Sequence, residues 1–290
     1  MPELPEVQTI VNDLNRKIKG LTITDVWTDW PKYFRCSFGN FKKTIVGRKI
    51  GKIRRIGKNI IFDLSGGKEI LIHQKMTGHL LVGSWIMDRG KWIAAKKGPL
   101  AEKVNGYIHV MFIFGGNNML ALSDLRKFAK ILAVDKKDFE NLEDVKNIGP
   151  DPLAAGFNFG DFKNLIMKKR GPIKKVLMDQ SVVSGIGNIY SDEILFAAKM
   201  HPLKKAEKLS DKELRAIFSA TKKILKKAIK LRGTSISDYR DTAGKSGCYS
   251  EARLVYRKEG ERCPMRCGGK IKRLKIGGRS AHFCPSCQKI

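Results

Sequence analysis

Four cysteines near the C-terminus constrain the fold of this chain more than any other feature. Cys263 and Cys267 form one close pair, and Cys284 and Cys287 form a second pair sixteen residues further on. Four thiolates at this spacing can enclose one zinc ion in tetrahedral geometry. Two disulfides or free thiols are the alternative. In an intracellular chain the pairs favour a metal site.

The segment between the two pairs predicts the structure that the metal would hold. Residues 270–276 and 279–283 flank Gly277-Gly278, a dipeptide typical of a two-residue hairpin turn. A β-hairpin of this length cannot bury a core of its own. We therefore expect one structural zinc per chain to stabilise it.

The net charge restricts the partners of the chain. It is +29 over 290 residues, and residues 201–290 alone hold 24 Lys and Arg against 8 Asp and Glu. Disorder does not explain the excess, because 42% of the residues are apolar and are interleaved with the lysines. A polyanion that relieves the self-repulsion is expected, and nucleic acid is the usual one. On charge alone, a ribosomal protein or a merely very soluble protein is the alternative.

The hydrophobic pattern changes along the chain and predicts an α+β multidomain fold. Apolar residues at helical spacing predict a helix over 5–18, and short β-like runs separated by turns, such as 115–118, fill 21–134. These segments together predict an N-terminal helix with an antiparallel β-sandwich. Proline and glycine at 147–152 mark a domain boundary, and Ser210 to Glu213 form a capping box that opens a helix. We expect domains at 1–146, 147–250 and 251–290.

Two further segments suggest chemistry. Ser184-Gly185-Ile186-Gly187-Asn188 joins a predicted helix at 173–179 to one that begins near 189, and a glycine-rich turn before a helix offers backbone N–H groups to a phosphate. An ordinary packing joint is the alternative. At the N-terminus, removal of Met1 would expose Pro2 as a secondary amine able to attack a carbonyl-like carbon, with Glu3 beside it to move protons. Met-Pro starts are common, so this pattern is weak by itself.

Taken together, these patterns resemble the formamidopyrimidine-DNA glycosylase and endonuclease VIII family over nearly the whole chain. The resemblance rests on Pro2 to Val7, on Ile173 to Tyr190 with the following His201-Pro202, and on the cysteine hairpin. It implies a helix–two-turn–helix motif at 173–190, within the domain expected at 147–250, and a C-terminal zinc finger at 251–290. Because Leu4 and the Met76 loop match the formamidopyrimidine branch, we expect 8-oxoguanine and formamidopyrimidines as the lesions. Oxidised pyrimidines are the runner-up.

The resemblance also implies roles for single residues. Pro2 would be the nucleophile, with Glu3 assisting loss of the base and Lys58 contacting phosphate and taking part in catalysis. Residues expected to contact DNA are His73, Met76, Arg126, Phe128, Lys174, Asn188 and Arg279. Among these, Met76, Arg126 and Phe128 would fill the gap left by an extruded base. The segment 234–249 resembles the loop over that base.

The implied function is a bifunctional DNA glycosylase and AP lyase. It would act through a Schiff base on Pro2, followed by β,δ-elimination. Three departures from the family pattern are Gln8 in place of Glu, the Cys-x3-Cys spacing and Leu125 in place of Pro. A non-catalytic zinc-finger DNA-binding protein and an RNA-binding protein are the rival hypotheses.

The expected partner is damaged double-stranded DNA, bound by a monomer. No run of eighteen apolar residues predicts a membrane span, and the acidic start lacks the pattern of a secretory signal. We therefore expect an intracellular protein. It would lie in the cytoplasm with the DNA in a prokaryote, and in the nucleus or at a viral replication site otherwise.

Overall fold

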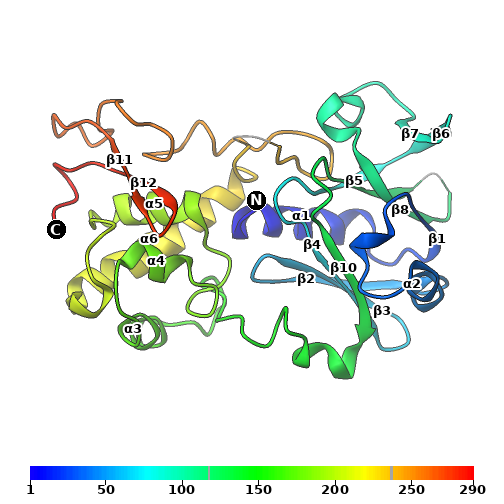
Figure 1. Cartoon of the computed structure of the whole chain (residues 1–290), viewed down its shortest axis with the longest axis horizontal. Coiled ribbons are helices and arrows are strands. Elements are labelled where there is room, and N and C mark those ends of the chain that lie inside the picture. Colours follow the sequence, from blue (N-terminus) through cyan, green and yellow to red (C-terminus); the bar gives the residue numbers. More distant parts are fainter. Residues whose placement is uncertain (117, 236–237) are drawn as a thin grey trace. The chain divides into compact units, whose positions relative to one another are not determined.

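The computed structural model describes residues 1–116, 118–235 and 238–290, and the chain divides into two compact units (Figure 1). Unit 1 comprises Met1–Lys146 and Leu231–Ser250, and unit 2 comprises Asn147–Lys230 and Glu251–Ile290. The expected turn at 115–118 and the segment 234–249 are therefore described without residues 117, 236 and 237. Residues 231–250, placed with the helical domain by sequence, group with unit 1. The three-domain division stays a prediction.

Unit 1 is an antiparallel β-sandwich preceded by a helix, as the sequence predicts. Its elements are α1 (Leu4–Lys17), β1 (Ile23–Thr28), α2 (Phe38–Ile45), β2 (Ile50–Ile56), β3 (Asn59–Leu64), β4 (Lys68–His73), β5 (His79–Gly83), β6 (Trp85–Asp88), β7 (Lys91–Ala94), β8 (Ile108–Phe114), β9 (Met119–Ser123) and β10 (Lys130–Asp135). One sheet has the order β1-β8-β9-β5, and the other has the order β10-β4-β3-β2. A small hairpin of β6 and β7 lies outside both sheets.

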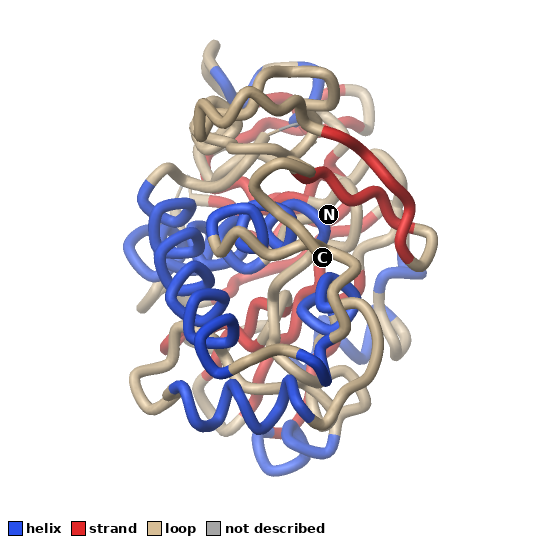
Figure 2. Tube along the Cα trace, turned by 90° about the vertical axis from the view of Figure 1, so that its left-hand side faces the viewer, coloured by secondary structure: helices blue, strands red, loops and turns tan. Residues whose placement is uncertain are grey.

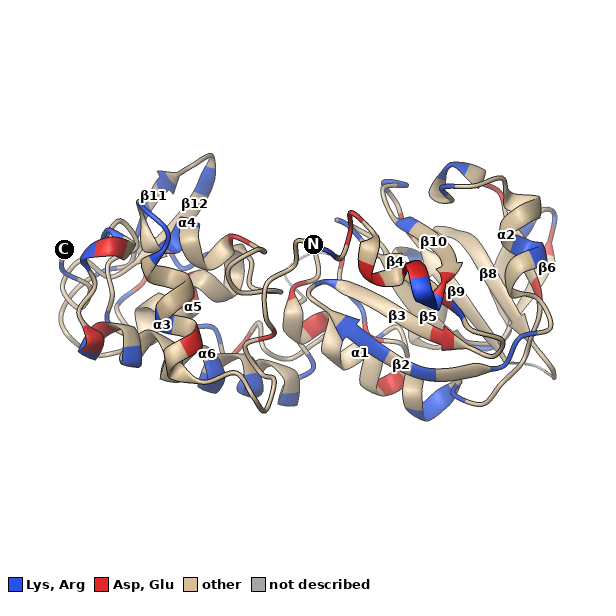
Figure 3. Ribbon diagram, turned by 90° about the horizontal axis from the view of Figure 1, so that it is seen from below, with Lys and Arg blue, Asp and Glu red and all other residues tan. Residues whose placement is uncertain are grey.

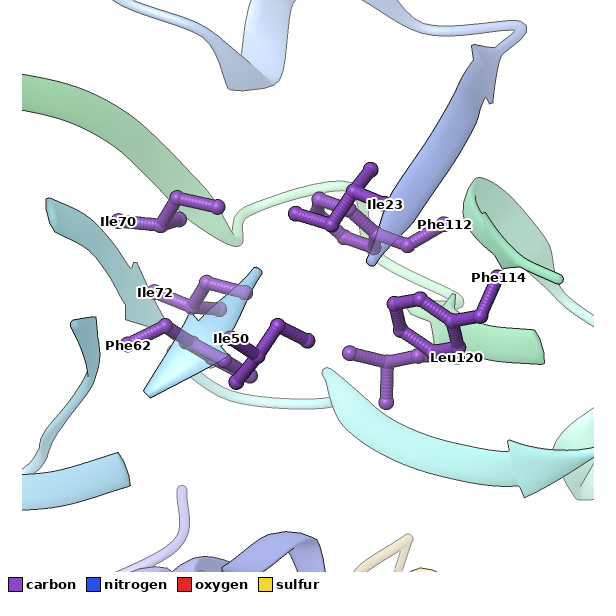
Figure 4. A pocket seen from close by; sticks show the side chains of 8 residues that line it. All are labelled: Ile23, Ile50, Phe62, Ile70, Ile72, Phe112, Phe114 and Leu120. Carbon is purple, nitrogen blue, oxygen red and sulfur yellow. The ribbon is translucent and has the colours of Figure 1, made fainter. Parts of the chain in front are cut away.

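The core of unit 1 lies between its two sheets. Figure 4 shows apolar side chains of both sheets facing one another, those of Ile23, Ile50, Phe62, Ile70, Ile72, Phe112, Phe114 and Leu120. The cavity that they line has a volume of about 10 Å³. A cavity of this size is far too small for a nucleobase, so it belongs to the core and not to a substrate site. α1 contributes Val7, Ile10 and Leu14 to this core, all fully buried at helical spacing.

Unit 2 combines four helices with a two-stranded hairpin. Its elements are α3 (Phe159–Met167), α4 (Ile173–Met178), α5 (Asn188–Ala197), α6 (Asp211–Lys230), β11 (Lys272–Ile276) and β12 (Arg279–Phe283). Figure 2 distinguishes its helices from the hairpin strands by colour. The predicted capping box is confirmed at the start of α6, where Glu213 N–H donates to Ser210 Oγ at 3.4 Å and Ser210 N–H donates to Glu213 Oε2 at 2.9 Å. Within the described ranges, no helix is long and apolar enough to cross a membrane.

Candidate functional site

The N-terminus of α1 holds the first group of candidate residues. Glu3 is the N-cap, and its side chain accepts the backbone N–H of Glu6, while Glu6 Oε2 accepts the N–H of Glu3 at 2.8 Å. Pro2 is buried and Glu3 is only 3% exposed. This capping box fixes the Glu3 carboxylate at the positive end of the helix, directly beside the chain terminus.

The terminal amine lies in an unusual electrostatic environment. Burial lowers the pKa of the Met1 amine below its ordinary value of 8.0, the charge of Lys58 acts in the same direction, and Glu3 and Glu6 oppose both. The net lowering leaves more of the amine unprotonated at neutral pH, which is the form that can attack carbon. Removal of Met1 would leave the secondary amine of Pro2 one residue from this position.

Lys58 reaches this environment through a tight turn. Ile56 pairs with Asn59, so Gly57 and Lys58 alone connect β2 to β3. Gly57 has φ 58°, the left-handed value that the first position of a two-residue turn favours for glycine. Lys58 is 8% exposed, and its charge acts on the terminal amine. The structure therefore brings Pro2, Glu3 and Lys58 into one electrostatic neighbourhood.

Segment 231–250 is fixed to α1 by charges that sequence reasoning missed. Arg232 forms ion pairs with Asp13 and with Asp241, the latter at 2.7 Å, and both carboxylates are buried. Burial raises the pKa of Asp13, but hydrogen bonds from Arg232 and its charge outweigh this effect and hold the pKa below its usual value. Thr234 N–H also donates to Glu6 Oε1 at 2.7 Å. The N-terminal helix and the base of segment 234–249 are therefore parts of one hydrogen-bonded structure.

Two loops of unit 1 expose the side chains expected to enter DNA. Met76 is 42% exposed and Phe128 is 51% exposed. The guanidinium of Arg126 lies over the Phe128 ring at 4.6 Å from its centre. His73 would not contact DNA as a cation. Burial lowers its pKa to about 4, and its Nδ1 accepts the backbone N–H of Lys75 at 2.9 Å. It is therefore neutral at pH 7 and shapes the loop.

In unit 2 the predicted turn before Asn188 is closed by one side chain. Gln180 accepts the Gly185 N–H at 2.9 Å, and its amide donates to Ile186 O at 2.7 Å and to Met178 O at 2.9 Å. Gly185 has φ 86°, a value that residues with a Cβ rarely adopt. α5 then begins at Asn188. Gln180 lies within the segment that carries the family resemblance, but only the structure shows that it closes both turns.

Lys174 is the most buried of the residues expected to contact DNA. Its side chain is 1% exposed, and Nζ donates to Asp192 Oδ1 at 2.5 Å. His282 donates its backbone N–H to Asp192 Oδ2 at 2.9 Å, and its Nδ1 lies 2.9 Å from the same oxygen. Lys174 also lines the groove that contains Arg279, so its contact with DNA stays a prediction.

The four cysteines converge as a metal site requires. Their sulfur atoms all lie within 4.8 Å of one another, with 3.7 Å between Cys263 and Cys287 and 3.5 Å between Cys267 and Cys284. A tetrahedral zinc with Zn–S bonds of about 2.3 Å separates its sulfurs by about 3.8 Å. The donor set therefore fits one structural zinc, despite the Cys-x3-Cys spacing.

Arg279 follows the turn of the hairpin that this zinc holds. Gly277 and Gly278 have φ 54° and 76°, and Ile276 pairs with Arg279 across them. Arg279 is exposed and lines a groove with Lys169, Arg170 and Lys175. Figure 3 shows Lys and Arg along the hairpin and α6. A phosphate backbone would match the charge of this groove.

Comparison with protein families gives three matches. The formamidopyrimidine-DNA glycosylase N-terminal domain matches residues 1–131, and the formamidopyrimidine-DNA glycosylase H2TH domain matches residues 148–240. A zinc finger found in FPG and IleRS matches residues 260–290. The third match agrees with the geometry of the four sulfurs, and the cysteines form a structural zinc site.

Individual relatives are similar to this chain over their full length. The formamidopyrimidine-DNA glycosylase of Pelotomaculum thermopropionicum is 36% identical over 291 residues, and that of Listeria innocua is 37% identical over 290, with complete coverage of both chains in each case. A complex of the Lactococcus lactis Fpg with DNA containing an abasic site is similar with a TM-score of 0.87 and 32% identity, covering 99% of this chain and 100% of that one. A MutM complex with carbocyclic 8-oxo-G containing DNA gives a TM-score of 0.86 at 32% identity, with both chains fully covered.

Proposed function

Because this chain belongs to the formamidopyrimidine-DNA glycosylase family, we propose that it removes oxidised bases from double-stranded DNA and then cuts the strand at the abasic site. The favoured lesions are formamidopyrimidines and 8-oxoguanine, which similar solved complexes contain. The observation that carries the proposal is the start of α1, where Pro2 and Glu3 are buried and the charge of the buried Lys58 acts on the terminal amine, whose pKa is lowered. A protein that only binds DNA has no need of such an amine.

The reaction would begin on the nitrogen of Pro2 after Met1 is removed. The unprotonated amine attacks C1′ of the damaged nucleotide, and the bond from C1′ to the base breaks, with its electron pair leaving on the base. Opening of the sugar ring at its oxygen gives an iminium between Pro2 and C1′. Glu3 lies next to this nitrogen and is placed to transfer protons during base loss and ring opening.

The same iminium accounts for strand cleavage. Its positive charge withdraws electrons and makes the C2′ protons acidic. Loss of one proton expels the 3′ phosphate by β-elimination, and a further proton loss expels the 5′ phosphate by δ-elimination. Lys58, which is 8% exposed, would attract the phosphate next to the lesion and favour the unprotonated amine. Asn188 and Arg279 would bind the flanking phosphates from unit 2.

Borohydride trapping tests this proposal, because it reduces an iminium to a permanent protein–DNA bond. Processed protein should form the adduct with a lesion-bearing duplex, and Pro2→Gly should lose most of it. Glu3→Gln should lower excision of intact lesions about a hundredfold and yet still nick a ready-made abasic site. A form that retains Met1 and traps DNA as well as processed protein would disprove the role of Pro2.

A panel of duplexes, each with one defined lesion, tests the substrate class. Excision of formamidopyrimidines and 8-oxoguanine ahead of oxidised pyrimidines is the expected order. The reverse order would assign the endonuclease VIII type of specificity. Binding without any adduct on the whole panel would favour a non-catalytic DNA-binding protein instead.

A further inference from the structure

We propose that Asp124 and Thr77 form a positioning pair that locks two loops together, so that Met76, Arg126 and Phe128 meet DNA as one preformed unit. The two loops are 74–78, between β4 and β5, and 124–129, between β9 and β10. This inference rests on the proposed function, because it assigns the pair a role in extruding the damaged base.

Asp124 is the anchor of the second loop. Its side chain is fully buried, and Oδ2 accepts the N–H of Phe128 at 2.8 Å, the N–H of Ala129 at 2.9 Å and the hydroxyl of Tyr33 at 3.3 Å. Oδ1 accepts the hydroxyl of Thr77 at 2.5 Å. A buried carboxylate is tolerated when donors fill its lone pairs in this way. Backbone N–H groups of the loop that exposes Phe128 thus converge on one buried carboxylate, that of Asp124.

Thr77 extends this anchor to the other loop. Its hydroxyl donates to Asp124 and also accepts the backbone N–H of Arg126 at 3.1 Å, which uses both of its hydrogen-bonding functions. Thr77 directly follows Met76 and is 6% exposed. One hydroxyl therefore connects the residue beside Met76 to the backbone of Arg126 and to the anchor of Phe128.

The two loops also share a backbone feature that needs such a connection. Lys75 and Lys127 both have φ 55°, and each directly precedes an exposed apolar side chain, Met76 or Phe128. A left-handed conformation is unfavourable for a residue with a Cβ and persists where surrounding bonds fix it. In the second loop, Lys127 N–H donates to Asp124 O at 3.1 Å. The pair thus holds a backbone shape that raises two apolar side chains into solvent.

The consequence for function is preorganisation. Met76 and Phe128 lie exposed in the protein, and insertion between stacked bases would bury them. Ordering flexible loops during binding would subtract from the free energy available to extrude a base. Loops that are already fixed avoid this loss, so the pair should matter most for substrates whose base must be extruded.

The first test removes one hydroxyl. Thr77→Val keeps the side-chain shape, Thr77→Ser restores the hydroxyl, and Thr221→Val is the matched control, because Thr221 is also buried but donates to Ile217 O within α6. Thr77→Val should lower kcat/KM for an intact lesion about tenfold, while cleavage of a preformed abasic site, which has no base to extrude, changes less than about twofold. Thr77→Ser and Thr221→Val should resemble wild type. Unchanged excision, or equal losses on both substrates, would overturn the proposal.

A double-mutant cycle shows whether Thr77 acts through the wedge residue. Phe128→Ala should reduce excision by itself, and adding Thr77→Val should then have little further effect, because both changes act on one loop. Fully additive losses would mean that Thr77 does not work through this loop, and would also overturn the proposal.

Hydrogen exchange separates this inference from the proposed function. The Arg126 amide donates to Thr77 Oγ1, so its exchange should rise at least about tenfold in Thr77→Val without any DNA present. Amides of β11 and β12 should not change. A wild-type protein that excises no lesion would disprove the function, whereas an unchanged Arg126 exchange rate would disprove the positioning pair.

Discussion

The hairpins β2–β3 and β11–β12 have the same kind of two-residue turn but are stabilised by different parts of the structure. Each joins its strands through two residues, and each has a glycine at the first position, with φ 58° at Gly57 and 54° at Gly277. Each also places a cation at the turn, Lys58 within the first turn and Arg279 directly after the second. Locally the two hairpins are nearly equivalent.

Their surroundings make the difference. β2 and β3 belong to a four-stranded sheet over a large apolar core, and Lys58 is buried there. In the part of the chain that the structure describes, β11 and β12 pair only with each other, and Arg279 is exposed. A lone two-stranded hairpin is marginally stable in water, so the metal, the buried charge of Asp192 and a small apolar cluster with Phe196 must hold it. The same turn thus places a buried cation in one unit and an exposed cation in the other, which agrees with the catalytic role proposed for Lys58 and the phosphate contact proposed for Arg279.

Loss of the zinc should have the largest effect, because it should unfold the β11–β12 hairpin and leave the β2–β3 hairpin intact. Cys284→Ser removes a fully buried ligand from a site whose binding free energy is on the order of 10 kcal/mol. We expect released zinc, an unfolded hairpin and lost DNA binding, with little change in the melting of unit 1. Metal analysis, DNA titration and calorimetry measure these effects, with the exposed Cys36→Ser as control. Full activity without zinc would refute the metal's role.

The buried charge beneath the hairpin should have the next largest effect. Asp192→Asn weakens the partner of Lys174 and of His282, and disrupting a buried ion pair costs about 3 kcal/mol. Denaturant unfolding of unit 2 should show this loss. The exposed pair of Glu143 with Lys146 is the control, since Glu143→Gln should cost less than about 1 kcal/mol. Equal losses in the two variants would mean that Asp192 does not support the hairpin.

Arg279 should then show what the hairpin contributes to binding. Arg279→Ala should weaken binding of damaged and undamaged duplexes together and make the salt dependence shallower by about 0.9 in the slope of log K. Titrations at several salt concentrations measure this slope. A constant slope would remove Arg279 from the phosphate contacts.

The smallest expected effect lies in the turns themselves. Gly278 has φ 76°, and a Cβ added there would meet no atom of the described residues within 4 Å. Gly278→Ala should therefore cost only the left-handed backbone, about 1 kcal/mol. In the small hairpin this should weaken DNA binding about fivefold. Gly57→Ala should leave DNA affinity closer to wild type, because the core holds the rest of its sheet. Equal effects on affinity would show that the two hairpins have similar support.

Much of the local structure could be predicted from sequence. Apolar spacing placed a helix at 5–18, and α1 spans Leu4–Lys17. Gly277-Gly278 and the cysteine pairs located the zinc hairpin, and Ser210 with Glu213 located the start of α6. These features depend on residues close together in the chain, whose turn, capping and metal chemistry follows from their type and spacing.

The pairing of buried charges could not be predicted in the same way. Asp13 with Arg232, Thr77 with Asp124, and Asp192 with Lys174 and His282 join residues whose side chains show no distinguishing local pattern. The resemblance implied a DNA contact for Lys174 and did not show its buried ion pair with Asp192. Segment 231–250 follows a helix in sequence, yet its charges attach it to unit 1.

The sequence by itself therefore determined the elements, the metal ligands and the family resemblance. Only the tertiary structure decided which side chains lie buried and which carboxylate each cation meets. The physical reason is that periodicity, turns and ligand spacing act over a few residues, whereas burial of a charge depends on every element packed around it. In this protein the candidate nucleophile, Pro2, could be predicted from the sequence. Thr77 and Asp124, which we propose to position the side chains that enter DNA, could be recognised only from the fold.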